Sequence, residues 1–312
     1  MAKKFSHRHL LDIERLSAGD IDTILALAES NLKSLKNTPK KAGKLQGKTL
    51  VNLFFEPSTR TRTSFEIAAK RLGADVVNIL IDQSSTKKGE SLLDMVEAID
   101  ALGANALVIR HAEDGVPQFV APHVKASVVN AGDGKHEHPT QALLDALVMR
   151  RHKKKLKGLT VAICGDIQHS RVARSNIHLL NKYGAKVRII APSYFMPLDF
   201  KNMKVEAFDD LKKGIAGADV IMMLRIQHER LGEGEFAVSL KEYSRDFGLN
   251  HDKLKAAKPD VIVMHPGPVN RDVEISSDLA DDPKFSVIRE QVQTGVAVRM
   301  AVLDLLMSQK SR

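Results

Sequence analysis

The chain has 312 residues, of which 43% are hydrophobic and 27% charged, so it can bury a sizeable core and we expect a globular protein of two domains. It contains no run of 18 apolar residues and no apolar signal segment, which predicts a cytoplasmic protein, and the single cysteine, Cys164, excludes an internal disulfide framework and a cysteine-rich metal site. The net charge of +9 suits nucleic acid or small anions, but 4% aromatic residues and no tryptophan supply few side chains for stacking on bases.

Short apolar strands alternate with helical patterns through the first half of the chain. We expect strands at 49–55, 75–81, 106–110 and 127–130, and helices at 58–72, 91–102 and 139–151. Gly73 follows the first helix, where a left-handed residue is common, and Pro139 begins the last one, as proline often does in a first helical turn.

The basic run at 151–158 ends in glycine and marks the expected seam between the domains. A solvated helix end, where cations favour the helix dipole, explains it better than a nucleic-acid patch. Beyond it we expect strands at 160–164, 186–190, 205–207, 220–224 and 261–264, a helix at 171–183, and a long amphipathic segment at 286–308 that packs back on the first domain. This order predicts an α/β protein with two parallel β-sheets flanked by helices, and ligands at the carboxyl ends of the strands.

The strongest functional signal is Phe54-Phe-Glu-Pro-Ser-Thr-Arg-Thr-Arg62, where a strand is expected to end and a helix to begin. The backbone N–H groups and the dipole of a helix N-terminus favour an anion there. Ser58, Thr59 and Thr61 add hydroxyl donors, and Arg60 adds a planar fork that suits phosphate or carboxylate. A well-capped helix with surface arginines is the alternative, but these side chains exceed what capping needs, so we favour an oxyanion site.

This motif resembles the phosphate-binding signature of the aspartate and ornithine carbamoyltransferases, and the later motifs follow the order of that family over nearly the whole chain. The resemblance implies that residues 1–150, completed by a C-terminal helix at 288–312, bind carbamoyl phosphate, and that residues 151–287 bind the amino acid. It also implies a homotrimer with active sites shared between subunits, no metal and no organic cofactor.

Two further segments belong to the carbamoyl phosphate half by this resemblance. The polar segment 84–90 would by itself be a flexible loop, but in the family it reaches into a neighbouring subunit's site. By motif match, Ser84 then contacts carbamoyl phosphate and Lys88 contacts aspartate. Arg110 ends an expected strand and would by itself equally be an arginine in water, whereas the resemblance assigns it to carbamoyl phosphate.

The glycine-rich segment 130–141 contains His136 and His138, which invite a metal site. Neither a His-x-x-x-His spacing nor a cysteine ligand accompanies them, so we favour no metal. The resemblance instead implies that His138 donates to the carbamoyl carbonyl oxygen and that Gln141 holds the carbamoyl amide group.

Arginines also follow strands of the second domain. Arg171 closes a segment that lacks the Gly-x-Gly-x-x-Gly pattern of a dinucleotide site, and by resemblance it binds an aspartate carboxylate. The resemblance also implies that Arg225 and Gln227, after a later strand, face aspartate. Aspartate brings two carboxylates and needs cations around it, whereas the cationic side chain of ornithine needs a carboxylate. We therefore expect aspartate as the acceptor, with ornithine or another amine as the alternative.

The late motif His265-Pro-Gly-Pro268 forces an unusual turn, for which a cis bond before Pro268 is one solution. In the family, the backbone carbonyl groups of Gly267 and Pro268 accept N–H groups of the substrates. Ornithine enzymes typically carry His-Cys-Leu-Pro here, which again favours aspartate. Asp272 stands where we expect glycine, which leaves the local backbone open.

The resemblance implies direct attack of the aspartate α-amine on carbamoyl phosphate, with Arg60, Thr61, Arg110 and His138 stabilising the oxyanion and the departing phosphate. Cys164 is then a small core residue and no nucleophile. Two rivals remain: a nucleic-acid binder, which rests on the charge of +9, and a relative that binds without reacting. The lysines are scattered along the chain, which disfavours the nucleic-acid binder. All seven motifs are usable, which disfavours a relative that binds without reacting. The sequence leaves open a higher assembly with regulatory chains or a dihydroorotase.

Overall fold

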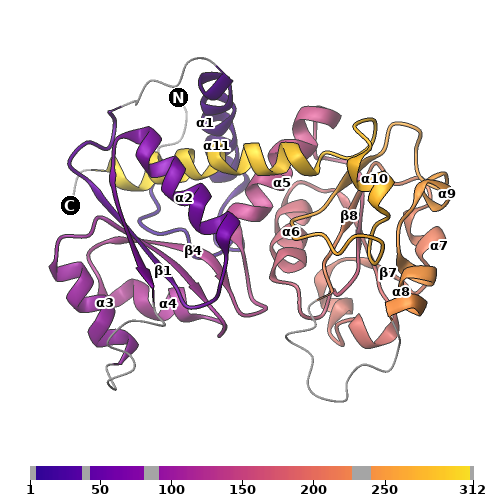
Figure 1. The fold of residues 1–312 in the computed structure, drawn as a ribbon, viewed down its shortest axis with the longest axis horizontal. Coiled ribbons are helices and arrows are strands. Elements are labelled where there is room, and N and C mark those ends of the chain that lie inside the picture. Colours follow the sequence, from indigo (N-terminus) through magenta and orange to yellow (C-terminus); the bar gives the residue numbers. More distant parts are fainter. Residues whose placement is uncertain (1–4, 37–42, 81–90, 227–239, 310–312) are drawn as a thin grey trace. The chain divides into compact units, whose positions relative to one another are not determined.

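The computed structural model describes residues 5–36, 43–80, 91–226 and 240–309. The chain folds into two compact units (Figure 1), each with its own parallel sheet. Unit 1 consists of Met1–Leu144 together with Gln293–Arg312, and unit 2 of Asp145–Val292. Both the α/β class and the two helix-flanked parallel sheets expected from the sequence are confirmed.

The sheet of unit 1 has the strand order β2-β1-β3-β4, with every neighbouring pair parallel. Its strands are β1 (Thr49–Phe54), β2 (Asp75–Leu80), β3 (Ala106–His111) and β4 (Ser127–Asp133). All four expected strands are present. β4 runs three residues beyond the expected end because Asp133 pairs with His111 after a register shift.

Helices cover both faces of this sheet (Figure 1). They are α1 (Ala18–Lys36), α2 (Thr59–Leu72), α3 (Leu92–Ala101), α4 (Val116–Val120), the 3₁₀ turn η3 (Ala121–His123), the start of α5 (Pro139–Lys153) and the end of α11 (Ile288–Met307). Val96 of α3 and Val120 of α4 pack on Leu107 of β3 in one buried cluster. The guanidinium of Arg299 in α11 lies 5.1 Å from the ring centre of Phe65 in α2, which confirms that the last helix returns to the first domain.

Helix α1 is an element that the sequence analysis did not predict. Ser17 and Asp20 form its start reciprocally: the Ser17 N–H donates to Asp20 Oδ2 at 2.9 Å, and the Asp20 N–H donates to Ser17 Oγ at 3.2 Å. The sequence carries this signal as a Ser-x-x-Asp capping box before an apolar run. Ile21, Ile24 and Leu25 of that run are fully buried.

The sheet of unit 2 has the order β7-β6-β5-β8-β9 and is likewise parallel. It contains β5 (Thr160–Cys164), β6 (Lys186–Ile190), β7 (Glu206–Phe208), β8 (Val220–Met223) and β9 (Ile262–Met264). Its helices are α6 (Arg171–Lys182), α7 (Leu211–Ile215), α8 (Leu240–Phe247), α9 (His251–Leu254) and α10 (Ser277–Asp281), with 3₁₀ turns η4 (Ser193–Phe195) and η5 (Phe200–Met203). β7 begins one residue later than expected because Glu206, and not Val205, pairs with Arg188 of β6.

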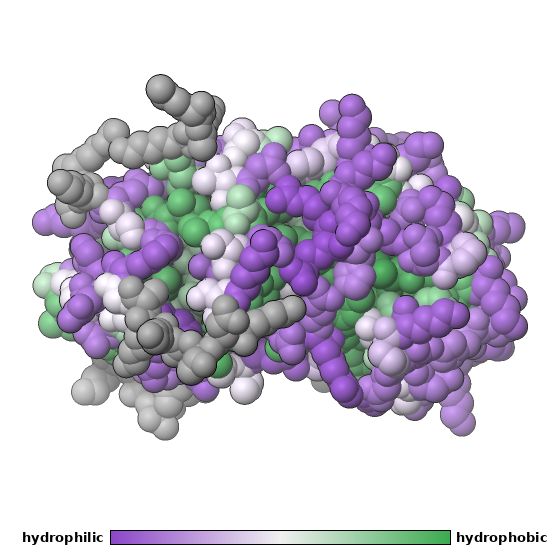
Figure 2. Space-filling view, turned by 90° about the horizontal axis from the view of Figure 1, so that it is seen from above, coloured by the Kyte–Doolittle hydropathy of each residue, from purple (hydrophilic) through white to green (hydrophobic). Residues whose placement is uncertain are grey.

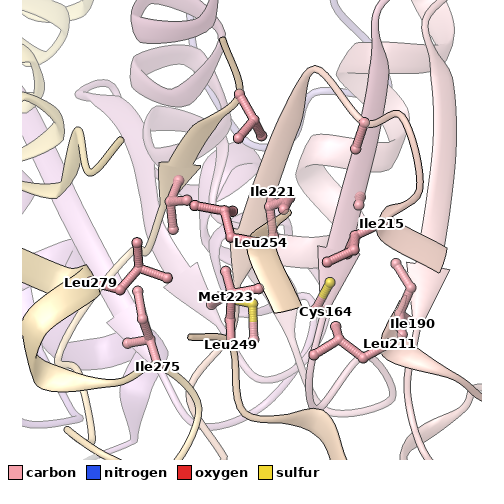
Figure 3. Close-up of a cluster of buried hydrophobic side chains, with 14 residues drawn as sticks. Cys164, Ile190, Leu211, Ile215, Ile221, Met223, Leu249, Leu254, Ile275 and Leu279 are labelled. Carbon is pink, nitrogen blue, oxygen red and sulfur yellow. The ribbon is translucent and has the colours of Figure 1, made fainter. Parts of the chain in front are cut away.

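One face of the second sheet is sealed by an apolar cluster (Figure 3). Cys164 and Met223 project from the strands against Leu211 and Leu254 of the covering helices. Cys164 is 1% exposed, which confirms it as a core residue, and burial raises the pKa of its thiol. A thiol held in its neutral form in this way is a poor nucleophile.

Hydrophilic side chains predominate on the face shown in Figure 2, and hydrophobic ones show between them. The most exposed large apolar side chains among the described residues are Leu198 (98%) and Leu102 (87%), one in each unit. Isolated apolar residues of this kind are normal on a protein surface. Within the described ranges, no helix has the length and apolar character needed to cross a membrane.

Candidate active site

Each sheet has one place where the strand order reverses direction. In unit 1 it lies between β1 and β3, and in unit 2 between β5 and β8. The loops that leave the carboxyl ends of two such strands turn to opposite faces of the sheet, which opens a crevice for ligands. Arg60 follows β1 and Arg110 is the last residue but one of β3, whereas Arg171 follows β5 and Arg225 follows β8. The predicted anion-binding residues therefore gather at both reversal points.

The first turn of α2 is arranged differently from those of the serine-capped helices α3 and α6. Ser58 is the N-cap, with φ −158° and ψ 90°, but its side chain makes no capping hydrogen bond. Ser91 and Ser170 occupy the same position in α3 and α6, and each accepts a backbone N–H. Because no acidic residue lies in the first turn of α2, its N–H groups face no competing carboxylate there. The arrangement favours an oxyanion site over a purely structural cap.

The other predicted residues of this turn differ in exposure. Thr61 is buried, at 9% exposure, whereas Thr59 and the guanidinium-bearing Arg60 are exposed. An exposed arginine on a helix start can meet a ligand without disturbing the core. These residues thus combine backbone, hydroxyl and cationic donors at the carboxyl end of β1.

Arg110 is held in place by two contacts. Its Nε atom lies 3.3 Å from Glu56 Oε2, and its Nη1 atom donates to the carbonyl oxygen of Ala131 at 3.2 Å. The side chain is only 15% exposed, so the alternative of an arginine standing in water is not supported. Pairing in the sheet places Arg110 opposite Phe54, the last residue of β1. The backbone register therefore brings it to the start of the first motif.

The loop before His138 is built around the buried carboxylate of Asp133. This group accepts the N–H of Gly115 at 2.7 Å, Nδ2 of Asn130 at 2.7 Å and the N–H of Glu137 at 3.1 Å. Burial by itself raises the pKa of Asp133, but the hydrogen bonds, of which that with His136 is the largest, outweigh it and lower the pKa. No role for Asp133 was expected from the sequence, although an Asp between two glycines is a common turn signal.

His136 also supports this loop. Its Nδ1 atom lies 2.9 Å from Asp133 Oδ2, and this hydrogen bond raises the pKa of His136. In the ranges that the structure describes, no group of three or more His, Cys, Asp or Glu side chains is placed to hold a metal ion.

His138 lies immediately before α5, and Gln141 lies in the first turn of that helix. The Gln141 N–H donates to the His138 carbonyl oxygen at 3.0 Å, and both residues are buried, at 4% and 8% exposure. The preceding Glu137 fixes this turn, because its carboxylate accepts the N–H of Ile13 at 3.0 Å. Unit 1 thus brings seven predicted residues to the carboxyl edge of its sheet: Ser58, Thr59, Arg60, Thr61, Arg110, His138 and Gln141.

In unit 2, the ends of β5 and β8 approach each other closely. The Leu224 N–H donates to the Cys164 carbonyl oxygen at 2.8 Å. Gly165 has φ +128°, and a Cβ atom there would lie 2.8 Å from the Leu224 carbonyl oxygen, so only glycine fits. This close approach brings the segment that leads to Arg171 alongside the segment that leads to Arg225.

Arg171 is the first residue of α6, as the sequence predicted. The Ser170 side chain caps this helix by accepting the Ala173 N–H at 3.1 Å, and Asp166 Oδ1 accepts the His169 N–H at 3.1 Å. Arg171 itself is 6% exposed. A guanidinium that is buried to this degree requires polar partners. It is better suited to binding a specific anion than to standing in bulk water.

The turn after β9 has the unusual backbone expected from its prolines. The Gly267–Pro268 peptide bond is cis, and Gly267 has φ +67°. Asp272 also adopts a left-handed conformation, with φ +64°, which explains why glycine was expected there. Its carboxylate accepts the N–H and the Oγ–H of Ser277 at 2.8 and 2.9 Å and so holds that conformation.

Three predicted site residues, Ser84, Lys88 and Gln227, lie outside the described residues.

Comparison with known proteins identifies both halves of the chain. Residues 8–151 match the carbamoyl-P binding domain of aspartate/ornithine carbamoyltransferases, and residues 157–306 match the Asp/Orn binding domain of the same family. The chain is 56% identical over 302 residues to the aspartate carbamoyltransferase catalytic subunit of Rhodospirillum centenum, which covers 97% of this chain and 95% of that one. The corresponding subunit of Agrobacterium fabrum is 56% identical over 303 residues, covering 97% and 96%.

Solved structures give the same fold for two acceptors. Aspartate transcarbamoylase from Trypanosoma cruzi, in complex with carbamoyl phosphate and aspartate, aligns with a TM-score of 0.89 and 30% identity, covering 98% of this chain and 99% of that one. Ornithine carbamoyltransferase from Pyrococcus furiosus also aligns with a TM-score of 0.89, at 29% identity and 99% coverage of both. The fold alone therefore does not choose the acceptor, whereas the relatives at 56% identity are aspartate enzymes.

Proposed function

This chain belongs to the aspartate/ornithine carbamoyltransferase family, and from that premise we propose that it transfers the carbamoyl group of carbamoyl phosphate to the α-amine of L-aspartate. The products are N-carbamoyl-L-aspartate and phosphate, and the reaction is the committed step of de novo pyrimidine biosynthesis. The observation that carries the proposal is the placement of arginines at the reversal points of both sheets.

The acceptor follows from charge. Arg171 and Arg225 stand at the carboxyl ends of neighbouring strands in unit 2, where a dicarboxylic amino acid would find two cations. An ornithine side chain placed there would meet charges of its own sign. With Lys88 and Gln227, these arginines form the proposed aspartate site, in a domain of residues 151–287.

Carbamoyl phosphate is assigned to the other half, residues 1–150 completed by 288–312. Its phosphate would take the N–H groups at the start of α2, the side chains of Ser58, Thr59 and Thr61, and the guanidinium groups of Arg60 and Arg110. Ser84 adds a further contact by motif match. For the carbamoyl end, we assign the carbonyl oxygen to His138 and the amide to Gln141 and to the backbone carbonyl groups of Gly267 and Pro268.

Chemistry proceeds by direct attack of the amine on the carbamoyl carbon. Phosphate is already a good leaving group, so no covalent enzyme intermediate is required, and the departing phosphate accepts the amine proton. Holding both substrates in attack geometry supplies about 7–11 kcal/mol. His138, Arg60, Arg110 and Thr61 stabilise the oxyanion and the leaving phosphate, and one such donor is typically worth about 3–4 kcal/mol. The scheme uses neither a metal nor an organic cofactor.

We further propose that the protein acts in the cytoplasm as a homotrimer. Ser84 and Lys88 would then serve the site of a neighbouring subunit. Regulatory chains or a dihydroorotase could bind such a trimer without altering these roles.

The direct test is product formation from carbamoyl phosphate with L-aspartate and with L-ornithine, measured in parallel on the purified chain. We expect carbamoyl aspartate and an equal amount of phosphate, and no citrulline. Product with ornithine alone would be consistent with the proposed phosphate site but would contradict the assignment of Arg171 and Arg225 to aspartate. Absence of product with any amine would overturn the proposed activity.

A further inference from the structure

A histidine and a glutamate lie buried directly beneath the turn at 265–268. The side chains of His265 and Glu274 are both 0% exposed, and His265 Nε2 lies 3.3 Å from Glu274 Oε1. On the other side of the ring, His265 Nδ1 accepts the backbone N–H of Gly267 at 2.8 Å. Glu274 Oε1 also accepts the N–H of Asn270 at 3.0 Å. One carboxylate and one imidazole thus hold the turn at both of its ends.

These contacts fix the tautomer of the ring. The Gly267 N–H can only donate, so Nδ1 must carry a lone pair, and the proton of the neutral ring sits on Nε2. From there it points to Glu274 Oε1, 3.3 Å away, which serves as its acceptor. With the ring locked in this way, the orientation of the Gly267 peptide is determined.

The turn is also tied to other elements of unit 2 by a buried polar chain. The His265 N–H donates to Gln291 Oε1 at 2.9 Å, and Gln291 Nε2 donates to Asp145 Oδ1 at 2.8 Å. Asp145 Oδ2 in turn accepts Nδ2 of Asn176 in α6 at 3.0 Å. Because Arg171 begins α6, the same network connects the turn with the helix that carries a proposed aspartate contact.

A buried polar network of this kind stabilises a core less than apolar side chains of similar volume would. Burying a carboxylate and an imidazole costs free energy that an apolar pair of similar volume would avoid. The geometry points to a second task, and we propose that His265, held by Glu274, is a positioning residue that aims the carbonyl groups of Gly267 and Pro268 at the carbamoyl group. The inference rests on the proposed function, which supplies the substrate contact of those carbonyl groups.

Two substitutions separate this role from simple packing. Asparagine at 265 can place Oδ1 near the position of Nδ1 and still accept the Gly267 N–H, whereas leucine cannot. We expect His265→Leu to lower kcat/KM for carbamoyl phosphate on the order of 100-fold, the scale of a small misplacement of reacting groups. His265→Asn should retain activity to within about tenfold, the scale of one neutral hydrogen bond.

Inhibition by inorganic phosphate distinguishes a positioning role of His265 from a merely structural one. The phosphate contacts proposed above come from the start of α2 and from Arg110, and not from the turn. The inhibition constant of phosphate should therefore stay within about twofold in both variants while kcat/KM falls in His265→Leu. A parallel loss of phosphate inhibition would show general disruption and overturn the positioning role, as would a folded His265→Leu enzyme with near-parental kcat/KM.

If His265→Leu does not fold, nitrogen NMR of the histidine ring decides the question in the unmodified protein. A proton on Nε2, and a ring signal that shifts when carbamoyl phosphate binds but not when inorganic phosphate binds, would support the proposal. A proton on Nδ1, or equal shifts with both ligands, would overturn it. Failure of the proposed function has a different signature, because the parent itself would then form no carbamoyl aspartate.

Discussion

Arg110 and Glu56 form an ion pair inside unit 1, with 3.3 Å between Nε and Oε2, although they come from different strand ends. The Phe55 N–H donates to the Arg110 carbonyl oxygen at 2.9 Å, so the backbone itself brings the two residues together. The family resemblance implies another role for Glu56, a bridge to Arg171 and Arg230 that favours domain closure, and this stays a prediction because Arg230 lies outside the described residues. In the structure Glu56 orients the arginine that we assign to carbamoyl phosphate.

Removing the charge of Glu56 should therefore weaken the use of carbamoyl phosphate. We expect Glu56→Gln to lower kcat/KM for this substrate by about tenfold, because the ion pair that orients Arg110 loses one charge and residues in contact typically couple by about 0.5–3 kcal/mol. Arg110→Ala should cost on the order of 100-fold to 1000-fold, and adding Glu56→Gln to it should cost nothing more. Glu66→Gln on α2, where Glu66 pairs with Lys70, is the matched control. Additive losses in the double variant would contradict the orienting role.

Arg60→Ala should nearly abolish turnover, by at least about 100-fold in kcat, because it removes a donor to the leaving phosphate. Arg60 is exposed, so the free energy of unfolding should change little. Arg71→Ala at the other end of α2 removes the same charge from the same helix and should leave kcat within about twofold. Steady-state kinetics and thermal melts of both variants make the comparison. Near-normal turnover of the Arg60→Ala variant would contradict the assignment of Arg60 as a donor to the leaving phosphate.

Shared active sites predict complementation between two inactive variants. If Lys88 serves the neighbouring subunit, mixing Lys88→Ala chains with Arg60→Ala chains should restore part of the activity in hybrid trimers. Mixing each variant with itself is the control, and differently tagged chains would demonstrate that subunits exchange. Proven exchange without any recovered turnover would count against sites built from two subunits.

His251 should make the stability of the chain depend on pH. Its ring nitrogens lie 2.9 Å from Asp282 Oδ2 and 3.0 Å from Asp278 Oδ2, and these hydrogen bonds raise the pKa of His251 above 6.5. The hydrogen bond with His251 lowers the pKa of Asp282 below 3.8, whereas the pKa of Asp278 is lowered chiefly by a hydrogen bond with Ser276 and less by His251. For a raised histidine pKa, the stabilisation is complete below the unfolded value of 6.5 and is lost as pH rises through the folded value. For the lowered carboxyl values, it is lost as pH falls through those folded pKa values.

We therefore expect His251→Ala to lower Tm more at pH 6 than at pH 9, as measured by thermal melts in matched buffers. The site is exposed, so the shift should be modest and should shrink with added salt. His123→Ala in unit 1, at another exposed histidine, is the matched control. An equal Tm shift at both pH values would argue that His251 contributes by packing alone.

The strand-and-helix order could be predicted because each signal is local. Apolar runs such as the one ending at Phe54, the glycine after α2 and the proline that begins α5 appear in the sequence at the positions where the elements begin and end. Helix α1 was missed although its capping box is equally local. The phosphate motif was recognisable for the same reason, since its donors are consecutive residues on one helix start.

By itself, the sequence determined the α/β class, the order of the strands along the chain and the chemical types of the site residues, because these depend on periodicity and on neighbours in the chain. Only the tertiary structure decided which strand ends stand side by side, and hence that Arg110 pairs with Glu56 and that Gly165 meets Leu224. It alone also decided that His265 turns its two nitrogens to Gly267 and Glu274. Such contacts depend on sheet register and burial, which join residues distant in sequence and leave no local signal in either partner.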